Sequence, residues 1–362
     1  MSSIFNGKIK ISIFGESHGK SIGAVLDNVP ASEKIDFNKI LAQMSRRSPG
    51  VNNLSTQRRE DDYPEILSGI LNGYTTGAPI AAIIKNKDII SKDYEDLKDV
   101  PRPGHVDFPA AVKYNGFNDF RGGGHFSGRL TAALTFAGAV CRQIVEKRGI
   151  KIGAHVLSIG EIKDENFDET NIQDSLISKL NSSSFSVINT KQKIKMEQKI
   201  LEIKNQNDSI GGSIECAITG FPVGLGEPIF GGVESLISAL VFSIPAIKGI
   251  EFGAGFKTMF LKGSENNDEF ILKDGKIATK TNNHGGILGG LTSSMPVIFK
   301  VAVKPTPSIA LEQNSINVET REMAKIQVNG RHDPCIVPRA VPVVEAIAAI
   351  AALDLMIGGH KL

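Results

Sequence analysis

Histidines that stand next to glycine are the residues of this sequence best suited to chemistry. An imidazole acts as an acid and a base near neutral pH, and glycine has no side chain to shield it from a ligand. Of the seven histidines, those with such a neighbour are His18, His105, His125, His284 and His360. His18 and His105 also have serine or arginine close by, which predicts a functional role for both. His155 lies in an apolar stretch and is predicted to be structural, and His360 belongs to the C-terminal tail.

Arginine is concentrated in the early part of the chain. The cluster consists of Arg46, Arg47, Arg58, Arg59, Arg102, Arg121 and Arg129. Between Arg148 and Arg321 there is no arginine, and Arg331 and Arg339 follow. A planar guanidinium grips phosphate or carboxylate through two parallel hydrogen bonds, which a lysine point charge cannot do. The distribution predicts a site for a multiply charged anion; a lysine-biased composition is the plainer explanation.

The glycine-rich string at residues 122–128 is predicted to be a flexible loop that leads into a helix. Apolar residues with helical spacing follow it, at Leu130, Leu134, Ala137, Cys141 and Ile144. The N-terminus of a helix presents free backbone N–H groups and the positive end of the helix dipole. This string is therefore a second indication of an anion site.

Other kinds of site find little support. There is no H-E-x-x-H string, no paired cysteine spacing and no acidic calcium loop, so no metal site is predicted. The segment 113–120 is a poor strand, which disfavours a dinucleotide-binding unit at the glycine string. No G-x-x-x-x-G-K-[ST] string occurs, so a Walker loop is not predicted. Residues 15–19 resemble the G-x-S-x-G elbow, but a strand rather than a helix is predicted directly after them.

The bulk composition favours a globular protein of the reducing cytosol. The chain has 362 residues, 41% of them hydrophobic, and a formal net charge of +2, so nucleic acid is not an expected partner. The three cysteines are far apart and predict neither a disulfide framework nor a zinc site. The N-terminus has no basic stretch followed by an apolar run, so no secretory signal is predicted. We expect a cytoplasmic protein without a membrane segment.

The predicted elements alternate between strands and helices without a strict repeat, which indicates a mixed α/β or α+β fold. Apolar patterns predict strands at 8–14, 20–26, 79–84, 213–219 and 297–303. Helices are predicted at 34–46 and 234–242, and two prolines predict an irregular stretch at 101–105.

Two segments stand apart from this pattern. Residues 160–208 are polar and predict surface helices and loops remote from the chemistry. Residues 343–357 are apolar on most faces. At about 15 residues this run is shorter than the roughly 20 needed to span a bilayer. It predicts a helix in the core or at a subunit interface.

Three strings taken together resemble the chorismate synthase family. They are Gly15–Asp27, Arg121–Arg129, and Gly330–Cys335 with Arg339 and Glu345 behind it. Further strings of family type occur between them in the same order, at 56–60, 102–107, 208–212, 224–228, 243–246, 283–290 and 304–308. Each string alone is weak, but so many in order over nearly the whole chain are not a coincidence.

The resemblance implies a reaction and an architecture. The family eliminates phosphate from 5-enolpyruvylshikimate 3-phosphate in an anti-1,4 sense to give chorismate, and it needs reduced FMN although the reaction is redox-neutral. A substrate with two carboxylates and a phosphate agrees with the arginine clusters. The implied fold is a β-α-β sandwich of the α+β class, with residues 1–362 as a single domain in a homotetramer.

The resemblance also implies residue roles. His18, with Ser17, is expected near the leaving phosphate, His105 against the flavin ring, and Asp333 near flavin N5, with Ser127 as a further catalytic residue. The implied flavin contacts are His125, Phe126, Ser127, Pro245, Ala246, Gly289, Lys304, Pro305, Thr306, Pro307, Ser308 and Arg331. The candidates for binding substrate or nicotinamide phosphate are Arg47, Arg58, Arg129 and Arg339.

This sequence departs from the family pattern at several positions. Asn28 replaces a glycine, His125 and Phe126 replace an Arg-Ser pair, and Asn53 stands where many relatives have arginine. The last change and the missing dinucleotide fingerprint favour a monofunctional enzyme that receives reduced FMN, with a separate flavin reductase as a partner and NADPH only as an external reductant. The alternatives are another flavin- or phosphate-using lyase and a non-catalytic phospho-ligand binding protein on the same scaffold.

Overall fold

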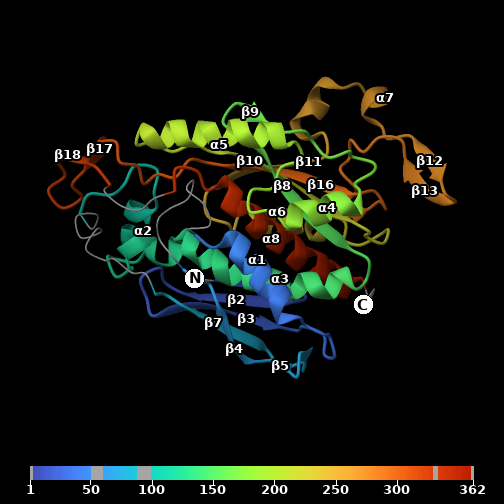
Figure 1. The fold of residues 1–362 in the computed structure, drawn as a ribbon, viewed down its shortest axis with the longest axis horizontal. Coiled ribbons are helices and arrows are strands. Elements are labelled where there is room, and N and C mark those ends of the chain that lie inside the picture. Colours follow the sequence, from blue (N-terminus) through green and yellow to red (C-terminus); the bar gives the residue numbers. More distant parts are fainter. Residues whose placement is uncertain (1–2, 50–59, 88–98, 329–332, 360–362) are drawn as a thin grey trace.

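Two five-stranded antiparallel sheets enclose a layer of helices (Figure 1). The computed structural model describes residues 3–49, 60–87, 99–328 and 333–359. The first sheet has the order β1 (Ile4–Asn6), β2 (Lys10–Gly15), β3 (Ser21–Asp27), β7 (Ile80–Lys85) and β4 (Pro64–Ser68). The second has the order β11 (Ile247–Phe252), β16 (Val297–Val303), β10 (Gly212–Thr219), β8 (Lys151–Ile159) and β9 (Ile162–Lys163). The expected α+β class is confirmed.

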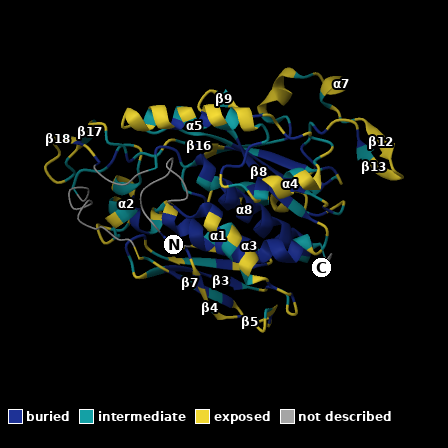
Figure 2. Ribbon diagram, viewed as in Figure 1, coloured by how far each residue is buried: buried dark blue, intermediate teal, exposed yellow. Residues whose placement is uncertain are grey.

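The helices between the sheets are largely buried, as the dark ribbons of Figure 2 show. The helices of the described residues, including those that lie outside the two sheets, are α1 (Phe37–Arg47), α2 (Asp107–Lys113), α3 (Thr131–Glu146), α4 (Asp174–Asn181), α5 (Thr190–Asn205), α6 (Val233–Val241), α7 (Gly263–Asn266) and α8 (Val337–Gly358). Helix α3 packs on the first sheet, α8 packs on the second, and the two helices pack against each other. Gly138 of α3 lies against Ala346 of α8 so closely that a Cβ would collide with it.

Short hairpins and 3₁₀ turns complete the fold. The hairpins pair β5 (Ile70–Leu71) with β6 (Tyr74–Thr75), β12 (Phe270–Lys273) with β13 (Lys276–Thr279), β14 (Ile287–Leu288) with β15 (Leu291–Thr292), and β17 (Gln313–Ile316) with β18 (Met323–Ile326). The 3₁₀ segments are η2 (Arg121–Phe126), η3 (Gly128–Leu130), η4 (Ile229–Gly231) and η5 (Gly255–Phe260).

The predicted strands and helices occur within a few residues of their expected positions. Ile80–Lys85 alternates buried and half-buried side chains against both neighbouring strands. Helix α1 begins after Asp36, whose carboxylate accepts a hydrogen bond from the Asn38 amide at 2.9 Å, and this cap sets where the helix starts. Residues 160–208, expected to lie on the surface, form α4 and α5 against the second sheet. They also bury Ile177, Leu180, Met196 and Ile200, so this segment contributes to the core.

The predicted extent of the C-terminal helix is wrong. Helix α8 has 22 residues and begins at Val337 rather than at Val343. Pro338 is tolerated in its first turn, and Pro342 lies inside the helix at the cost of one backbone hydrogen bond. Its length and apolarity would suffice to cross a membrane, but 89% of its most apolar stretch is buried inside the protein. Since neighbouring elements of the same chain already cover it, α8 is a core helix and leaves no free face for a subunit interface.

A buried ion-pair triad holds the three central helices together. Glu345 of α8, 1% exposed, accepts hydrogen bonds from Arg46 of α1 at 2.5 Å and from Arg142 of α3 at 3.1 Å. Arg46 also donates to the Ser183 carbonyl at 3.2 Å and to Ser186 Oγ at 3.3 Å. Each of these helices also has an end at the candidate site, so the triad fixes the relative position of those ends.

A second buried charge cluster lies in the second sheet, around His155. Its Nε2 is 3.0 Å from Glu215 Oε2, and its Nδ1 is 3.2 Å from Asp164 Oδ2. Burial alone lowers the pKa of His155, but hydrogen bonds with Asp164 and Glu215 outweigh it and raise the pKa above its ordinary value. The placement agrees with the predicted structural role.

We expect the His155 cluster to make stability depend on pH. Because the folded pKa is raised, the contribution is complete below about pH 6.5, the ordinary histidine value, and is lost as pH rises through the folded value. His155→Gln should lower the free energy of unfolding by about 1.5–3 kcal/mol at pH 6, and by less at pH 9. Urea unfolding of both proteins at the two pH values measures this. An equal loss at both would show that the imidazole is not charged in the fold.

Candidate active site

Three successive glycines shape the loop that meets the β2–β3 turn, which carries Ser17 and His18. Gly122, Gly123 and Gly124 all have positive φ angles, which L-residues with side chains rarely adopt. The amide of Ser17 donates to the Gly124 carbonyl at 3.0 Å. A Cβ on Gly122 would stand 2.6 Å from His18 Nε2 and 2.9 Å from Ser17 Oγ. The glycines therefore allow the two candidate catalytic side chains to lie directly against the loop.

We expect Gly122→Ala to displace Ser17 and His18 and to lower turnover by about 100-fold, since an ångström-scale misplacement can cost that much. Gly116→Ala is the matched control, because Gly116 also has a positive φ angle, its Cβ would meet no heavy atom within 4 Å, and it does not line the cavity described below. Steady-state kinetics and thermal melting of both variants separate misplacement from unfolding. Equal turnover in the two variants would contradict the role given to this contact.

His105 is held by ion pairs in the irregular stretch before α2. Asp107 accepts from Arg102 Nε at 2.7 Å and from His105 Nδ1 at 2.5 Å. Because a carboxylate only accepts, Nδ1 carries the ring proton, and Nε2 is the acceptor of the neutral ring, 3.3 Å from Arg102 Nη2. Arg102 also donates to Ser308 Oγ at 3.0 Å. Burial, with help from Arg102 and Lys304, lowers the pKa of His105 although Asp107 opposes it, so the ring is neutral at pH 7.

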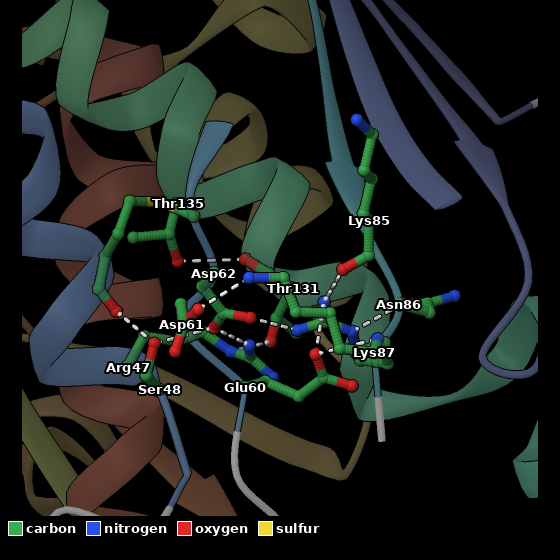
Figure 3. A network of polar contacts seen from close by, with 12 residues as sticks. Arg47, Ser48, Glu60, Asp61, Asp62, Lys85, Asn86, Lys87, Thr131 and Thr135 are labelled. Carbon is green, nitrogen blue, oxygen red and sulfur yellow. Dashed lines mark hydrogen bonds and ion pairs between the residues drawn. The ribbon is translucent and has the colours of Figure 1, made fainter. Parts of the chain in front are cut away.

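Arg47 and Arg129 converge on a single carboxylate, Asp62. Figure 3 shows Asp62 with Arg47 and Ser48 beside it. Arg47 ends α1, and its Nε donates to Thr131 Oγ1 at 3.2 Å. Arg129 lies in η3, and its Nε donates to Asn86 Oδ1 at 2.9 Å. Both guanidinium groups are buried. Burial, together with Arg339 and Arg129, lowers the pKa of Arg47 to about 10 despite the opposing effect of Asp62.

The first turn of α8 contributes a third arginine. Arg339 forms an ion pair with Asp333, and its Nε donates to the Arg47 carbonyl at 3.1 Å. Thr306 Oγ1 donates to the Asp333 carbonyl at 3.1 Å, and Lys304 Nζ donates to the Gly104 carbonyl at 2.5 Å. The segment 304–308 therefore joins the arginine cluster to the His105 network.

These groups surround one cavity of about 860 Å³, near the upper end of the range for ligand pockets. Of the predicted site residues, those on its wall are Ser17, Arg47, His105, His125, Phe126, Ser127, Arg129, Pro245, Ala246, Lys304, Thr306, Pro307, Ser308, Asp333 and Arg339. Apolar side chains such as Ile13, Leu134 and Val343 line other parts of it. The cavity therefore offers both a cationic wall and an apolar wall.

Some predicted site residues lie elsewhere. His18 is 8% exposed and lies behind Gly122 rather than on the cavity wall. Pro305 and Gly289 do not line the cavity, and Gly289 is in the β14–β15 turn. Arg58 and Arg331 lie outside the described residues. His125 lines the cavity, but Nδ1 is 2.7 Å from the Gly15 carbonyl and Nε2 is 2.6 Å from Ser3 Oγ, so the protein already occupies both nitrogens.

Sequence reasoning missed the acidic partners of these arginines. Asp62 and Asp107 received no predicted role. Asp107 is the last residue of the family-type string 102–107, and Asp62 follows the string 56–60 closely. The arginines themselves could have indicated these partners. A buried guanidinium needs a counter-ion, and the acidic residues nearest in the sequence are the first candidates. Glu60, which lines the cavity 3.7 Å from Arg129, belongs to the same group.

The described residues offer neither a metal site nor an activated cysteine as an alternative to this site. No group of three or more His, Cys, Asp or Glu side chains there could hold a metal ion. Cys141, Cys216 and Cys335 are buried, and burial raises the pKa of each thiol, so none is an activated nucleophile. Fold and cavity together define an α+β protein whose preformed, arginine-lined pocket suits a small anionic molecule.

Comparison with known proteins gives the family. The model of the family described as chorismate synthase matches residues 9–357. The chain is 45% identical to the chorismate synthase of Pyrococcus abyssi over 96% of its length and 95% of the relative's. It is 45% identical to that of Korarchaeum cryptofilum, covering 97% and 96% of the two chains. A crystal structure of a chorismate synthase superposes with a TM-score of 0.76 at 29% identity, covering 97% of this chain and 92% of the other. The chain belongs to the chorismate synthase family.

Proposed function

We propose that this protein converts 5-enolpyruvylshikimate 3-phosphate to chorismate by anti-1,4-elimination of phosphate, and is thus a carbon–oxygen lyase that depends on reduced FMN. Family membership supports the reaction. The observation that carries the proposal is the convergence of Arg47, Arg129 and Arg339, from three separate elements, on the same cavity as His105. Forked cations suit a substrate with two carboxylates and a phosphate, and exclusion of water strengthens their hold.

The residues present fit a flavin. An apolar wall accommodates a planar ring system, while Lys304, Thr306 and Ser308 add polar groups at one side of the same cavity. We assign FMN contacts to these three residues, to Pro245, Ala246 and Ser127 on the wall, and to Phe126, which is partly exposed near Tyr114. Gly289, Pro305 and Arg331 stay in the proposal on resemblance alone, as does His125 beyond its protein contacts. When bound, reduced FMN supplies electron density that assists cleavage of the C–O bond.

The chain's own groups handle the protons. His105 is neutral, with Nε2 as its acceptor, so it can take up a proton at the flavin ring while Asp107 holds the Nδ1 proton. Ser17 lines the cavity at the glycine loop, where it would hydrogen-bond the departing phosphate. His18 lies behind Gly122, and its role as proton donor to that phosphate stays in the proposal on resemblance alone. Asp333, fixed by Arg339, would assist the removal of the substrate proton. In this division of roles the arginines bind the anionic groups of the substrate, and His18, His105 and Asp333 transfer protons.

The remaining parts of the proposal concern the whole protein. The main core cluster contains residues of both sheets, which supports one domain over 1–362. Exposed apolar side chains gather on the arm of η5 and the β12–β13 hairpin, at Phe256, Phe260, Phe270 and Leu272. Such a surface favours burial in an oligomer, so we propose the homotetramer with this arm, rather than α8, at an interface. A cytoplasmic location and a separate flavin reductase complete the proposal.

Anaerobic turnover tests the function. Purified protein, photoreduced FMN and 5-enolpyruvylshikimate 3-phosphate should release chorismate and phosphate together, followed by absorbance and a phosphate assay. Repetition with oxidised FMN and NADPH decides whether the chain reduces its own flavin; we expect no product there without an added reductase. Tight flavin and substrate binding without product would replace the proposal with the non-catalytic binding protein.

A further inference from the structure

Asp62 is the shared partner of Arg47 and Arg129, two buried arginines that both line the cavity. Figure 3 shows Asp62 beside Arg47 and Ser48. Its Oδ2 accepts from Arg47 and, at 2.8 Å, from Ser48 Oγ, while its Oδ1 accepts from Arg129. These three donors come from the end of α1, the residue after it, and η3. One carboxylate thus joins elements that are far apart in the sequence.

Asp62 stands behind the arginines rather than among the groups that a ligand would meet. Its side chain is 0% exposed and does not line the cavity, whereas Arg47 and Arg129 both do. Its backbone has a φ of 49°, a left-handed conformation that is uncommon for a residue other than glycine. Such a conformation persists where the surroundings over-determine it. The position and backbone of Asp62 therefore suit an anchor rather than a ligand.

Each arginine keeps donors beyond those that anchor it. A guanidinium has five N–H donors in a rigid plane. Arg47 uses Nε for Thr131, one Nη1 hydrogen for Asp62 and one Nη2 hydrogen for the Gly128 carbonyl at 3.5 Å. Arg129 uses Nε for Asn86, one Nη1 hydrogen for Asp62 and one Nη2 hydrogen for the Lys85 carbonyl at 3.4 Å, which leaves each group two further N–H donors. These hydrogen bonds to the protein fix the plane of each guanidinium group. The remaining N–H donors of each group therefore have a defined direction.

We propose that Asp62 is the positioning residue that holds Arg47 and Arg129 in the geometry that receives the anionic groups of the substrate. This inference rests on the proposed function, because it concerns the substrate of the same cavity. Asp62 does not touch the substrate. It acts through the two guanidinium groups, by supplying the negative charge that lets them lie close together.

Charge explains why this anchor is needed. Arg47 faces Arg129 from η3 and Arg339 from α8, and like charges at this depth repel one another strongly. Asp62 opposes that repulsion, Glu60 stands beside Arg129, and Asp333 pairs with Arg339. Arg47 and Arg129 hold the pKa of Asp62 at about 2 although burial alone would raise it, so the carboxylate is ionised at every pH at which the protein would be assayed.

Calorimetric binding of 5-enolpyruvylshikimate 3-phosphate at pH 7 tests the proposal without turnover. We expect Asp62→Asn to raise the Kd by about 10- to 100-fold, because the arginines lose their fixed directions. Asp61→Asn is the matched control. Its carboxylate is adjacent but 71% exposed and pairs only with the exposed Lys87 among the described residues, so its Kd should equal that of the wild type.

The pH dependence separates positioning from a general structural defect. Asp62 raises the pKa of Arg47, so its loss should lower that pKa further and move the alkaline loss of substrate affinity to lower pH. Circular dichroism and thermal melting check that the variants fold. Should Asp62→Asn fail to fold, Ser48→Ala removes only one hydrogen bond to the same carboxylate, and we expect it to raise the Kd by about fivefold.

Each outcome of these experiments either supports or overturns the positioning role of Asp62. Unchanged or tighter substrate binding in a folded Asp62→Asn protein would overturn the proposal, and tighter binding would identify Asp62 as an internal competitor for the arginines. An unshifted alkaline limb would also overturn it. A wild-type protein that binds the substrate without turning it over would remove the proposed function and leave the Asp62 result valid. A wild-type protein that does not bind it would overturn both.

Discussion

His105→Ala is expected to lower kcat by about 10²- to 10⁴-fold, the range associated with a general acid or base, and to leave substrate binding close to that of the wild type. The reason is positional. His105 lines the cavity at the Arg102–Asp107 pair, apart from the Arg47–Asp62–Arg129 cluster that we assign to the substrate. Its loss removes a proton acceptor and none of the charges that bind the anion.

Anaerobic kinetics with reduced FMN, together with calorimetric substrate binding, measure this prediction. Asp107→Asn serves as a companion variant, because it keeps the ring and removes the carboxylate that raises the His105 pKa. We expect the pH limb of kcat that reports His105 to move to lower pH in this variant. Full turnover by His105→Ala would remove His105 from the reaction, and a parallel loss of substrate binding would reassign it to the binding surface.

Glu345→Gln is expected to have the largest effect on stability, a loss of about 3–5 kcal/mol in the free energy of unfolding. The substitution keeps the side-chain volume and removes the one charge that Arg46 and Arg142 share in the core. Two guanidinium groups would then remain buried without their common counter-ion, and α1, α3 and α8 would lose the contact that joins them. Urea unfolding followed by circular dichroism gives the difference.

Glu146→Gln is the matched control for this variant. Glu146 also pairs with Arg142, at 2.7 Å, but it lies on the last turn of α3 and its side chain is 33% exposed. Because solvent reaches the Glu146 carboxylate and screens the pair, we expect a smaller loss than for Glu345→Gln, about 1 kcal/mol. Similar losses in the two variants would mean that burial does not decide the value of the Glu345 triad.

Family membership could be recognised from short strings of residues, because each string is local. Glycines that adopt positive φ angles, as at 122–124, and the prolines around 101–105 restrict the backbone within a few residues, so their structural meaning is readable in sequence. The same holds for β3 and β7, whose apolar patterns report burial on a sheet. The extent of α8 was misjudged, because tertiary burial of the helix outweighs the local cost of Pro342.

Local patterns could not show which distant groups meet. Arg47, Arg129 and Arg339 were candidates for the same anion by residue type and by resemblance, but their convergence depends on how α1, α3 and α8 pack between the sheets. The pairing of Asp62 with both arginines, the enclosure of His18 behind Gly122, and the distance of Gly289 from the cavity follow from that packing too.

The sequence by itself determined the residue types, the turns and the family of this protein, because these depend on neighbours along the chain. The tertiary structure alone decided which carboxylate neutralises which arginine and which imidazole is neutral. Ion pairing and desolvation depend on distances and burial that arise only when segments remote in the chain are packed together.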